Sequence, residues 1–324
     1  MMETKDKTEK REGLDALRGI GITGIVLYHL FPSIFPGGFL GVPLFFVLSG
    51  YLMFTTSEKS WQNGDFYMVK YYKKRIWKIM PPLFILVIAV CCYLTITQCG
   101  QMAGIRQEIA SIFLGYNNWW QIGQNTSYFS KFAAGSPFTH LWFLSVEMQC
   151  YLLWPLLFLL YQKACQVIDR KKMCFVFLLL ALLSAGNMLF LYTPGEDPSR
   201  VYYGTDTMAF PLLIGIFAGA LRKPHKDPEL CIGRKTALAR SVVFALIVCI
   251  LLVTVEGKSS FLYPVGMFLI SLFFAAVMDQ IENRKIAGGK LSIPGTRFLS
   301  LLGNKSYLIY LWHYPILYIA RELM

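Results

Sequence analysis

The stretch "LDALRGIGITGIVLYHL", residues 14–30, is apolar along most of its length yet carries three titratable side chains. Asp15, Arg18 and His29 stand in a segment long enough to cross the hydrocarbon core of a bilayer. Ionisable groups at that depth cost free energy and usually face a polar interior or a substrate path. The stretch therefore predicts a membrane helix whose charges need an explanation.

The composition indicates a membrane environment for the whole chain. Its 324 residues are 55% hydrophobic and 15% charged, whereas a soluble domain carries about 25% charged residues. We therefore predict an all-α, polytopic membrane helix bundle. A weaker tenth candidate, residues 103–120, would form a short re-entrant or interfacial helix. The nine expected spans centre on residues 19–31, 37–56, 79–98, 141–161, 174–192, 206–221, 240–255, 261–278 and 300–320.

The net charge of +12 follows a topology pattern and gives no reason to expect a nucleic-acid partner. Lys and Arg cluster in alternate loops, and the basic run "KYYKKRIWK" at 70–78 is typical of a loop that contacts lipid headgroups. By the positive-inside rule the N-terminus lies in the cytoplasm. We expect a cytoplasmic tail at residues 1–12 and a single transmembrane domain at 13–321.

The eight cysteines are scattered, with no C-x-x-C pair and no histidine at metal-ligand spacing. We expect free thiols and no metal site.

The three charged positions of residues 14–30 have a regular helical spacing. Arg18 and His29 are eleven residues apart, so they lie on one helical face about 16 Å apart along the axis. Asp15 precedes Arg18 by three residues and can pair with it. The pair can also be an interfacial anchor at the headgroups. Neither capping nor an interfacial position explains His29 easily, which favours a functional role.

A second polar group lies in "THLWFLSVEMQCYLLWPLL", residues 139–157. His140, Ser145, Glu147 and Gln149 fall in the first turns of an otherwise apolar helix. Glu147 has no basic neighbour within four residues of its own helix, so it must find a partner elsewhere, be protonated, or face water.

Other polar residues have simpler explanations. Asp206 and Thr205 can cap the helix that follows them. His313 and His140 are flanked by aromatic residues and are typical of an interfacial belt. Glu147 fits neither explanation, and we favour a functional role for it.

Six stretches follow one another along residues 11 to 321. They are "REGLDALRGIGITGIVLYH", "PGGFLGVPLFFVLSGYLM", "YYKKRIWKIMPPL", "THLWFLSVEMQCYLLWPLL", "YYGTDTMAFPLLIG" and "LGNKSYLIYLWHYPIL". In this order they resemble the acyltransferase 3 family of multi-span membrane acyltransferases. The resemblance is specifically to the membrane domain of bacterial cell-wall and surface-glycan O-acetyltransferases.

The resemblance implies an enzyme of the bacterial plasma membrane. It would take an acyl group, most often acetyl, from cytoplasmic acyl-CoA (acetyl-CoA) and deliver it to a hydroxyl of a cell-wall or cell-surface glycan. The family's essential Arg-x10-His, Arg-x-x-Arg and Ser-x-Glu elements fall respectively on Arg18 and His29, on Arg75 and Lys78, and on Ser145 and Glu147.

This assignment agrees with elementary chemistry. Acyl transfer to an alcohol needs a base or nucleophile of near-neutral pKa, a property of imidazole in general, and His29 is the candidate. Glu147 would orient His29 or activate the acceptor hydroxyl, with Ser145 beside it. The phosphates of CoA need cations at the cytoplasmic side, and these are Arg18, Arg75 and Lys78. Four further residues are expected in supporting positions: Asp15, Tyr203, Asp206 and His313.

The chain departs from the family pattern at three charged positions. Pro43 stands where the family usually has Asp, and Met208 where it usually has Arg. We expect an ion pair between these positions in relatives, replaced jointly here. Met148 replaces a second Glu.

Many cell-wall relatives continue into an extracellular SGNH-type hydrolase domain, whereas this sequence stops at Met324. We expect that it acts on the acceptor itself, passes acyl groups to a separate extracellular transferase, or is part of a longer protein. The acceptor would meet the outer segment 99–140, whose aromatic and amide side chains suit sugars.

Two other functions remain open. The membrane charges would also suit a transporter or flippase, although the two halves show no internal repeat. A non-catalytic membrane module is the third possibility, against which the intact Arg-x10-His element argues.

Overall fold

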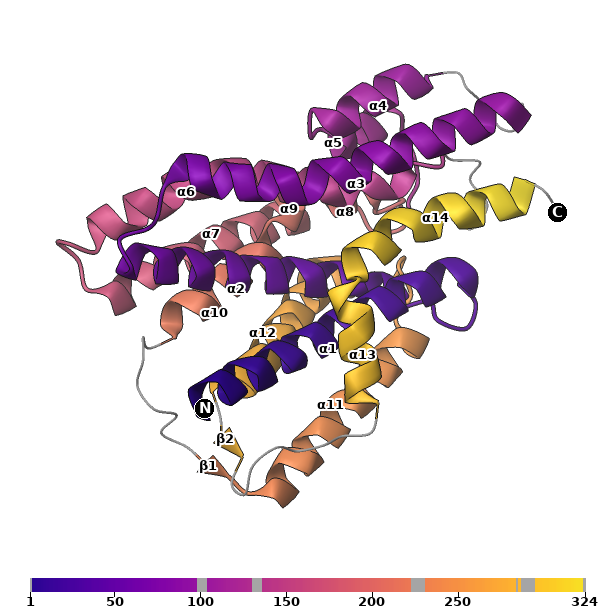
Figure 1. Cartoon of the computed structure of the whole chain (residues 1–324). Helices are drawn as coiled ribbons and strands as arrows, with labels where there is room; N and C mark the ends of the chain where they lie inside the picture. Colours follow the sequence, from indigo (N-terminus) through magenta and orange to yellow (C-terminus); the bar gives the residue numbers. More distant parts are fainter. Residues whose placement is uncertain are drawn as a thin grey trace. The chain divides into compact units, whose positions relative to one another are not determined.

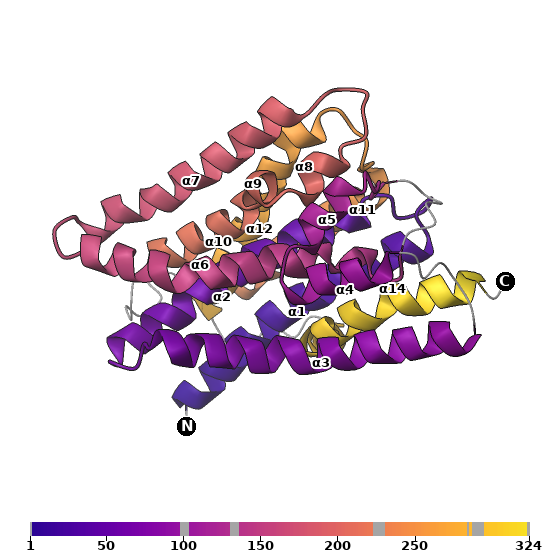
Figure 2. The same cartoon turned by 90° about the horizontal axis from the view of Figure 1, so that it is seen from above.

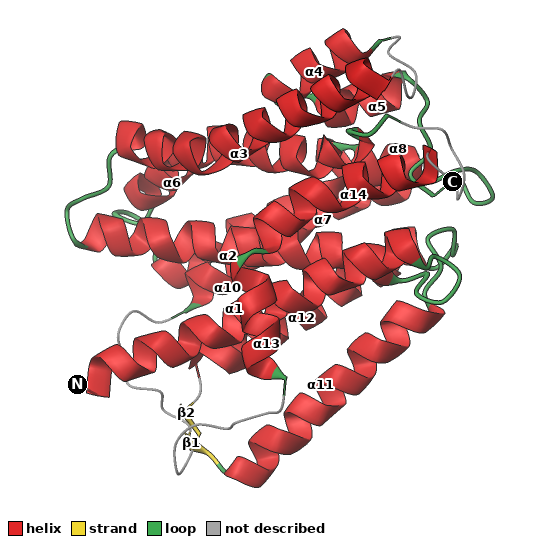
Figure 3. Cartoon of the chain, turned by 45° about the vertical axis from the view of Figure 1, so that its right-hand side comes forward, coloured by secondary structure: helices red, strands yellow, loops and turns green. Residues whose placement is uncertain are grey.

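A computed structural model describes residues 2–97, 104–129, 136–222, 231–283, 285–286 and 295–322. The described part is helical almost throughout, as Figure 3 shows in red. Its only strands, β1 (Cys231–Ile232) and β2 (Lys285–Ile286), form one short parallel pairing within the described residues. The all-α class is therefore confirmed.

Six helical segments in the described part of the chain are long and apolar enough to cross a membrane. They match six of the nine expected spans, and they indicate a multi-pass membrane protein. They contain α2 (Gly41–Gln62), α3 (Met68–Thr97), α6 (Trp142–Ala164), α7 (Arg170–Leu191), α11 (Arg234–Thr254) and α12 (Met267–Asn283). Three of the segments begin with a short non-α turn: the 3-10 turns η1 (Gly38–Leu40) and η2 (Thr139–Leu141), and the π-helical η3 (Leu262–Gly266).

The other three expected spans differ from the prediction. The span at 19–31 is the second half of a longer helix, α1 (Met2–Leu30). The span at 206–221 is divided into α9 (Thr205–Met208) and α10 (Phe210–Leu221). Pro211 explains this break, since it has no N–H to donate to the preceding turn. A count of nine continuous spans is thus not confirmed.

The last expected span, 300–320, is divided at Lys305. It consists of α13 (Thr296–Asn304) and α14 (Ser306–Glu322). Gly303 and Asn304 are weak helix formers at the end of α13. The N–H of Lys305 then donates to the carbonyl of Leu302 at 3.1 Å, which closes a tight turn.

The tenth candidate, residues 103–120, contains α4 (Ile105–Phe113) and begins α5 (Asn117–Gly123). Each is far too short to cross a bilayer. Gly115 makes the turn between them, with a φ of +74° that favours glycine.

The chain forms two compact units. Unit 1 consists of residues 1–52 and 211–307, and unit 2 of residues 53–210 and 308–324. α2 and α14 each contribute residues to both units. Asp15, Arg18 and His29 belong to unit 1, and the other predicted site residues belong to unit 2.

Unit 1 is held together by close helix contacts at glycines. α13 crosses and packs against α1 (Figure 1). A Cβ at Gly303 would lie 1.7 Å from the carbonyl oxygen of Asp15, and one at Gly19 would lie 2.0 Å from that of Leu299. Small residues permit such backbone contact between membrane helices. α1 is therefore fixed along the segment that carries Asp15 and Arg18.

Unit 2 has an aromatic core between α2, α6 and α7. Phe54 packs edge-on against Trp154, Phe158 and Phe177. The indole N–H of Trp154 donates to Ser57 at 2.9 Å. α3 packs against α6, and α5 packs against both α6 and α8 (Ser199–Tyr203). α9 lies beside α7 (Figure 2).

Candidate active site

In unit 1, α1 continues without a break through both members of the Arg-x10-His element. Arg18 and His29 therefore share one helical face, as their spacing predicts. The predicted pair also forms, because Nη1 of Arg18 donates to Oδ1 of Asp15 at 2.7 Å. The side chain of Asp15 is only 3% exposed and that of Arg18 is 29% exposed.

The imidazole of His29 is oriented by its own helix. Its Nδ1 lies 2.9 Å from the carbonyl oxygen of Ile25. A carbonyl can only accept, so Nδ1 carries the proton and Nε2 of the neutral ring is the basic nitrogen. The ring packs edge-on against Tyr28. This arrangement suits a general base with a fixed tautomer.

In unit 2, Glu147 finds its partner on its own helix. The phenol of Tyr151, one turn later on α6, donates to Oε1 of Glu147 at 2.6 Å. The guanidinium carbon of Arg75 lies 4.5 Å from the centroid of the Tyr151 ring, a cation–π distance. Arg75 also attracts the Glu147 carboxylate electrostatically. The structure thus links Arg75 to Glu147 through one tyrosine.

Arg75 and Lys78 are one turn apart on α3 and differ in their surroundings. Arg75 is half-buried and lies over the rings of Tyr151 and Tyr71. Lys78 is exposed. The two cations therefore differ, because Arg75 is stacked on aromatic rings and Lys78 is accessible.

Ser145 is buried, and its hydroxyl accepts from the backbone N–H of Asn117 at 3.1 Å. The Asn117 side chain donates to Ser111 at 3.0 Å, and Ser111 donates to the carbonyl of Glu108 at 2.6 Å. These bonds join α6, α5 and α4. Ser145 therefore holds the start of α5, a contact that sequence reasoning did not predict.

Glu108 is a buried carboxyl that sequence reasoning missed. Its Oε1 accepts from the side-chain amide of Gln121 at 3.0 Å, and the Ser136 hydroxyl is a second hydrogen-bond partner. Burial raises the pKa of Glu108, and the two hydrogen bonds only partly offset this.

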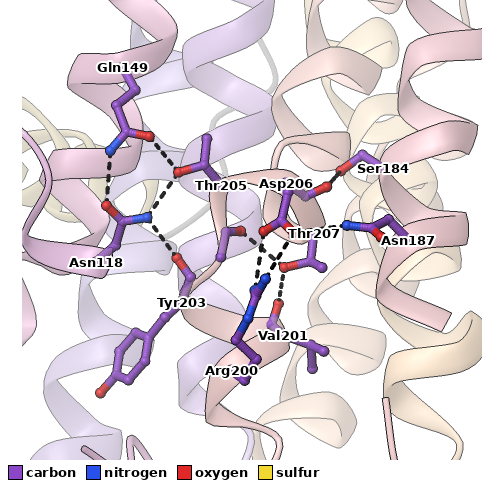
Figure 4. Close-up of polar contacts among 11 residues, drawn as sticks. Asn118, Gln149, Ser184, Asn187, Arg200, Val201, Tyr203, Thr205, Asp206 and Thr207 are labelled. Carbon is purple, nitrogen blue, oxygen red and sulfur yellow. Dashed lines mark hydrogen bonds and ion pairs between the residues drawn. The ribbon is translucent and has the colours of Figure 1, made fainter. Parts of the chain in front are cut away.

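An amide network joins α5, α6 and α9, as Figure 4 shows. Gln149 donates to Oδ1 of Asn118 at 2.9 Å and accepts from the Thr205 hydroxyl at 2.6 Å. Asn118 donates to Thr205 at 2.9 Å and to the backbone oxygen of Tyr203 at 3.0 Å. Tyr203 itself is buried, with its ring edge-on to Trp142.

Asp206 is an ion-pair partner and not a helix cap. Gly204 occupies the N-cap position of α9. The Asp206 carboxylate accepts from Nη1 and Nη2 of Arg200 at 3.2 and 3.0 Å, and from Asn187 at 2.9 Å (Figure 4). The capping explanation is therefore wrong for Asp206, and Arg200 is a partner that the sequence did not indicate.

His313 and His140 lie together in the interior of unit 2. Both are buried, and their ring centroids are 5.4 Å apart. Nε2 of His140 contacts the carbonyl of Leu311 at 3.1 Å, and Nδ1 of His313 contacts that of Tyr310 at 2.7 Å. Burial against one another replaces the interfacial-belt explanation for both residues.

The predicted pairing of His29 with Glu147 joins residues of different units and stays a prediction. Within unit 2, Arg75 of α3 and Glu147 of α6 meet at Tyr151, whereas Asp206 of α9 has separate partners, Arg200 and Asn187. Among the described residues, no group of three or more His, Cys, Asp or Glu side chains could hold a metal ion.

Comparison with known proteins extends these observations. A family model described as "Acyltransferase domain" (Acyl_transf_3) matches residues 11–324. The chain is 34% identical, over 96% of its length, to the "Peptidoglycan O-acetyltransferase OatA" of Listeria monocytogenes, of which it covers 50%. It is 35% identical, over 95% of its length, to the "Putative peptidoglycan O-acetyltransferase YrhL" of Bacillus subtilis, of which it covers 49%.

The chain thus spans about half the length of these curated relatives. No solved structure matches it.

Proposed function

The chain belongs to the acyltransferase 3 family, and from this premise we propose that it is an integral membrane O-acyltransferase. It moves an acetyl group from cytoplasmic acyl-CoA to a hydroxyl of a cell-wall or cell-surface glycan, or to a partner protein that completes the transfer. The relatives that carry the name peptidoglycan O-acetyltransferase support this acceptor class.

The protein crosses the bacterial plasma membrane several times with its N-terminus in the cytoplasm. The six apolar helical segments of the described residues support the multi-pass character. The alternation of basic loops in the sequence supports the orientation.

Arg18, Arg75 and Lys78 bind the phosphates of acyl-CoA, the donor substrate. Guanidinium groups match phosphate oxygens in pairs, and a flexible lysine adds a point charge. The exposure of Lys78 and the partial exposure of Arg18 support this role. The contacts of Arg75 with two tyrosine rings support a defined position for its guanidinium.

His29 acts on the acceptor hydroxyl. Its basic Nε2 removes the hydroxyl proton while the hydroxyl oxygen attacks the thioester carbonyl carbon. The tetrahedral intermediate then collapses, the carbon–sulfur bond breaks, and the CoA thiolate leaves and takes up a proton. The hydrogen bond from Nδ1 to Ile25 supports this role, because it fixes the tautomer that has Nε2 as the base. In an alternative form of this step, His29 carries the acyl group transiently. Radiolabelled acetyl-CoA would then label the protein itself.

Glu147 orients His29 or activates the acceptor hydroxyl, and Ser145 lies beside it, bonded to the start of α5. The bond from Tyr151 to Glu147 supports a defined position for the carboxylate. Tyr203, Asp206 and His313 support the surrounding frame, and Asp15 supports Arg18.

The observation that supports the proposal most is the unbroken α1 helix with Arg18 and His29 on one face. The test uses the purified full chain with radiolabelled acetyl-CoA and a soluble glycan acceptor. We expect His29→Ala to abolish glycan labelling, whereas Thr23→Ala, a control on the same helix, should retain it.

Full transfer by His29→Ala would overturn the assigned role of His29. Glycan uptake into proteoliposomes without acetyl-CoA would favour a transporter instead. An absence of hydrolysis, self-acylation and transfer by the native chain would favour a non-catalytic module.

A further inference from the structure

An exposed tryptophan and a half-buried ion pair meet on the surface of unit 2. Trp119 of α5 is 39% exposed. The guanidinium carbon of Arg200 lies 5.3 Å from the centroid of its ring. Arg200 and Asp206 form a bidentate ion pair, and their side chains are 38% and 34% exposed. The indole, the guanidinium and the carboxylate are therefore all partly accessible, and the guanidinium contacts both of the others.

The geometry of the ion pair depends on its neighbours. Oδ2 of Asp206 also accepts from the side-chain amide of Asn187 at 2.9 Å (Figure 4). A Cβ at Gly204 would lie 2.3 Å from Nη1 of Arg200 and 2.4 Å from Oδ1 of Asp206. Only glycine at this position leaves room for the pair as it stands.

Stability gives little reason for this arrangement. Ion pairs near the surface contribute about 0–1 kcal/mol, and an exposed indole gains little from burial. The placement of an exposed indole against a half-buried ion pair is better explained by a ligand that contacts all three groups.

The same short helix connects this surface to the predicted catalytic element. Asn117 bonds to Ser145 through its backbone N–H, and Asn118 bonds to Gln149 and Thr205. Trp119 follows immediately. A ligand on Trp119 would therefore lie next to the helix end that Ser145 holds, near the segment of α6 that carries Glu147.

The chemistry of the surface matches a sugar ring. Pyranose rings present an apolar C–H face that packs on an indole, and hydroxyl groups at the ring edge. A guanidinium has five N–H donors, of which the Asp206 bonds use two, so others can bind a hydroxyl or a sugar carboxylate. Carboxylate and amide oxygens accept from hydroxyls.

We propose that Trp119, Arg200 and Asp206 form the subsite that binds one sugar unit of the glycan acceptor. The proposal rests on the proposed acyl transfer to a glycan and names the surface that recognises the acceptor.

The experiment measures binding and transfer separately in the purified full chain. The probe is a soluble tetrasaccharide of alternating N-acetylglucosamine and N-acetylmuramic acid. We expect Trp119→Ala to weaken tetrasaccharide binding and to raise the acceptor KM by about tenfold. The rate of acetyl-CoA hydrolysis without acceptor should stay unchanged. Trp119→Phe should recover part of the affinity.

The matched control is Trp61→Ala. Trp61 lies in the same unit, is 41% exposed and packs on Phe66 and Phe158, away from the ion pair. The Trp61→Ala variant should bind the tetrasaccharide with the affinity of the native chain. Arg200→Gln should reproduce the loss of affinity with the indole in place, which separates ligand contact from misfolding.

Unchanged tetrasaccharide affinity in both Trp119→Ala and Arg200→Gln would overturn the proposal. The proposal would also be overturned if Trp119→Ala bound the tetrasaccharide normally and lost only its binding to anionic lipid vesicles. Trp119 would then be an interfacial anchor. Tetrasaccharide binding that depends on Trp119 in a chain without acetyl-CoA chemistry would support the subsite and refute the proposed transfer.

Discussion

The hydroxyl of Tyr151 donates a 2.6 Å hydrogen bond to the carboxylate of Glu147, one turn earlier on α6. The same aromatic ring lies 4.5 Å from the guanidinium carbon of Arg75 on α3. A single side chain, Tyr151, therefore connects the predicted site carboxylate, Glu147, to Arg75, a predicted acyl-CoA-binding cation. The proposed site depends on this tyrosine for the relative placement of two charges within unit 2.

Tyr151→Phe removes the hydrogen bond and keeps the ring under Arg75. A hydrogen bond to a charged group contributes about 1.5–3 kcal/mol. We expect transfer to fall by about tenfold or more in kcat, with little change in the acetyl-CoA KM, because the cation–π contact remains. Steady-state kinetics with radiolabelled acetyl-CoA check this.

Tyr72→Phe is the matched control. Its hydroxyl also bonds to α6, but to the backbone oxygen of Leu152 at 2.8 Å. The Tyr72→Phe variant should have a kcat close to that of the native chain. Equal effects of the two substitutions would show that Tyr151 acts only through general packing.

The buried Glu108 predicts a pH dependence of stability. Its folded-state pKa is raised, mainly by burial. At low pH the carboxyl is protonated in both the folded and the unfolded chain, so the free energy of unfolding does not change with pH there. As pH rises through the folded-state pKa, the unfolded chain ionises more easily, so the free energy of unfolding falls.

Thermal unfolding in detergent between about pH 4 and pH 8 measures this fall. Glu108→Gln cannot ionise, so its unfolding midpoint should decline less toward high pH than that of the native chain. Glu196→Gln, which changes an exposed carboxyl, controls for the loss of one surface charge. Parallel pH profiles for Glu108→Gln and the native chain would contradict the prediction.

Local helical spacing accounts for what the sequence predicted well. The Asp15–Arg18 pair and the shared face of Arg18 and His29 follow from positions three and eleven residues apart on one helix. The Tyr151–Glu147 bond obeys the same rule, since the two are four residues apart. It was not predicted, because a carboxylate within a membrane helix is expected to pair with a basic residue, and the partner here is a phenol.

Contacts that depend on tertiary folding could not be predicted from the sequence. Asn118, Gln149 and Thr205 come from three elements, and no spacing relates them. Arg200 and Asp206 lie on either side of Gly204, where α8 ends and where a Cβ would collide with both side chains. The breaks at Ala209 and Lys305 were missed because hydropathy averages over a window and does not register a single lost hydrogen bond.

Arg18 offers a way to separate donor binding from stability. Arg18→Ala removes the cation from the buried Asp15 carboxylate, which is costly when one partner of a pair is lost. Asp15→Asn combined with Arg18→Ala removes both charges and should unfold at a higher temperature than Arg18→Ala alone. Both variants lack the phosphate contact, so both should show a raised acetyl-CoA KM. A native KM in the stable double variant would exclude Arg18 from donor binding.

The contact between α1 and α13 gives the sharpest test of the fold. A Cβ at Gly303 would lie 1.7 Å from the backbone oxygen of Asp15, so Gly303→Ala must push the two helices apart. Overpacking of this kind costs about 1–3 kcal/mol, and it displaces the segment that carries Arg18. The control is Gly186→Ala in α7, where nothing lies within 4 Å of the added Cβ. That change should stabilise the helix by up to about 1 kcal/mol, because alanine is the better helix former. Thermal unfolding in detergent should therefore shift in opposite directions for the two alanines, and a Gly303→Ala chain as stable as Gly186→Ala would mean that α13 does not pack against α1 as described.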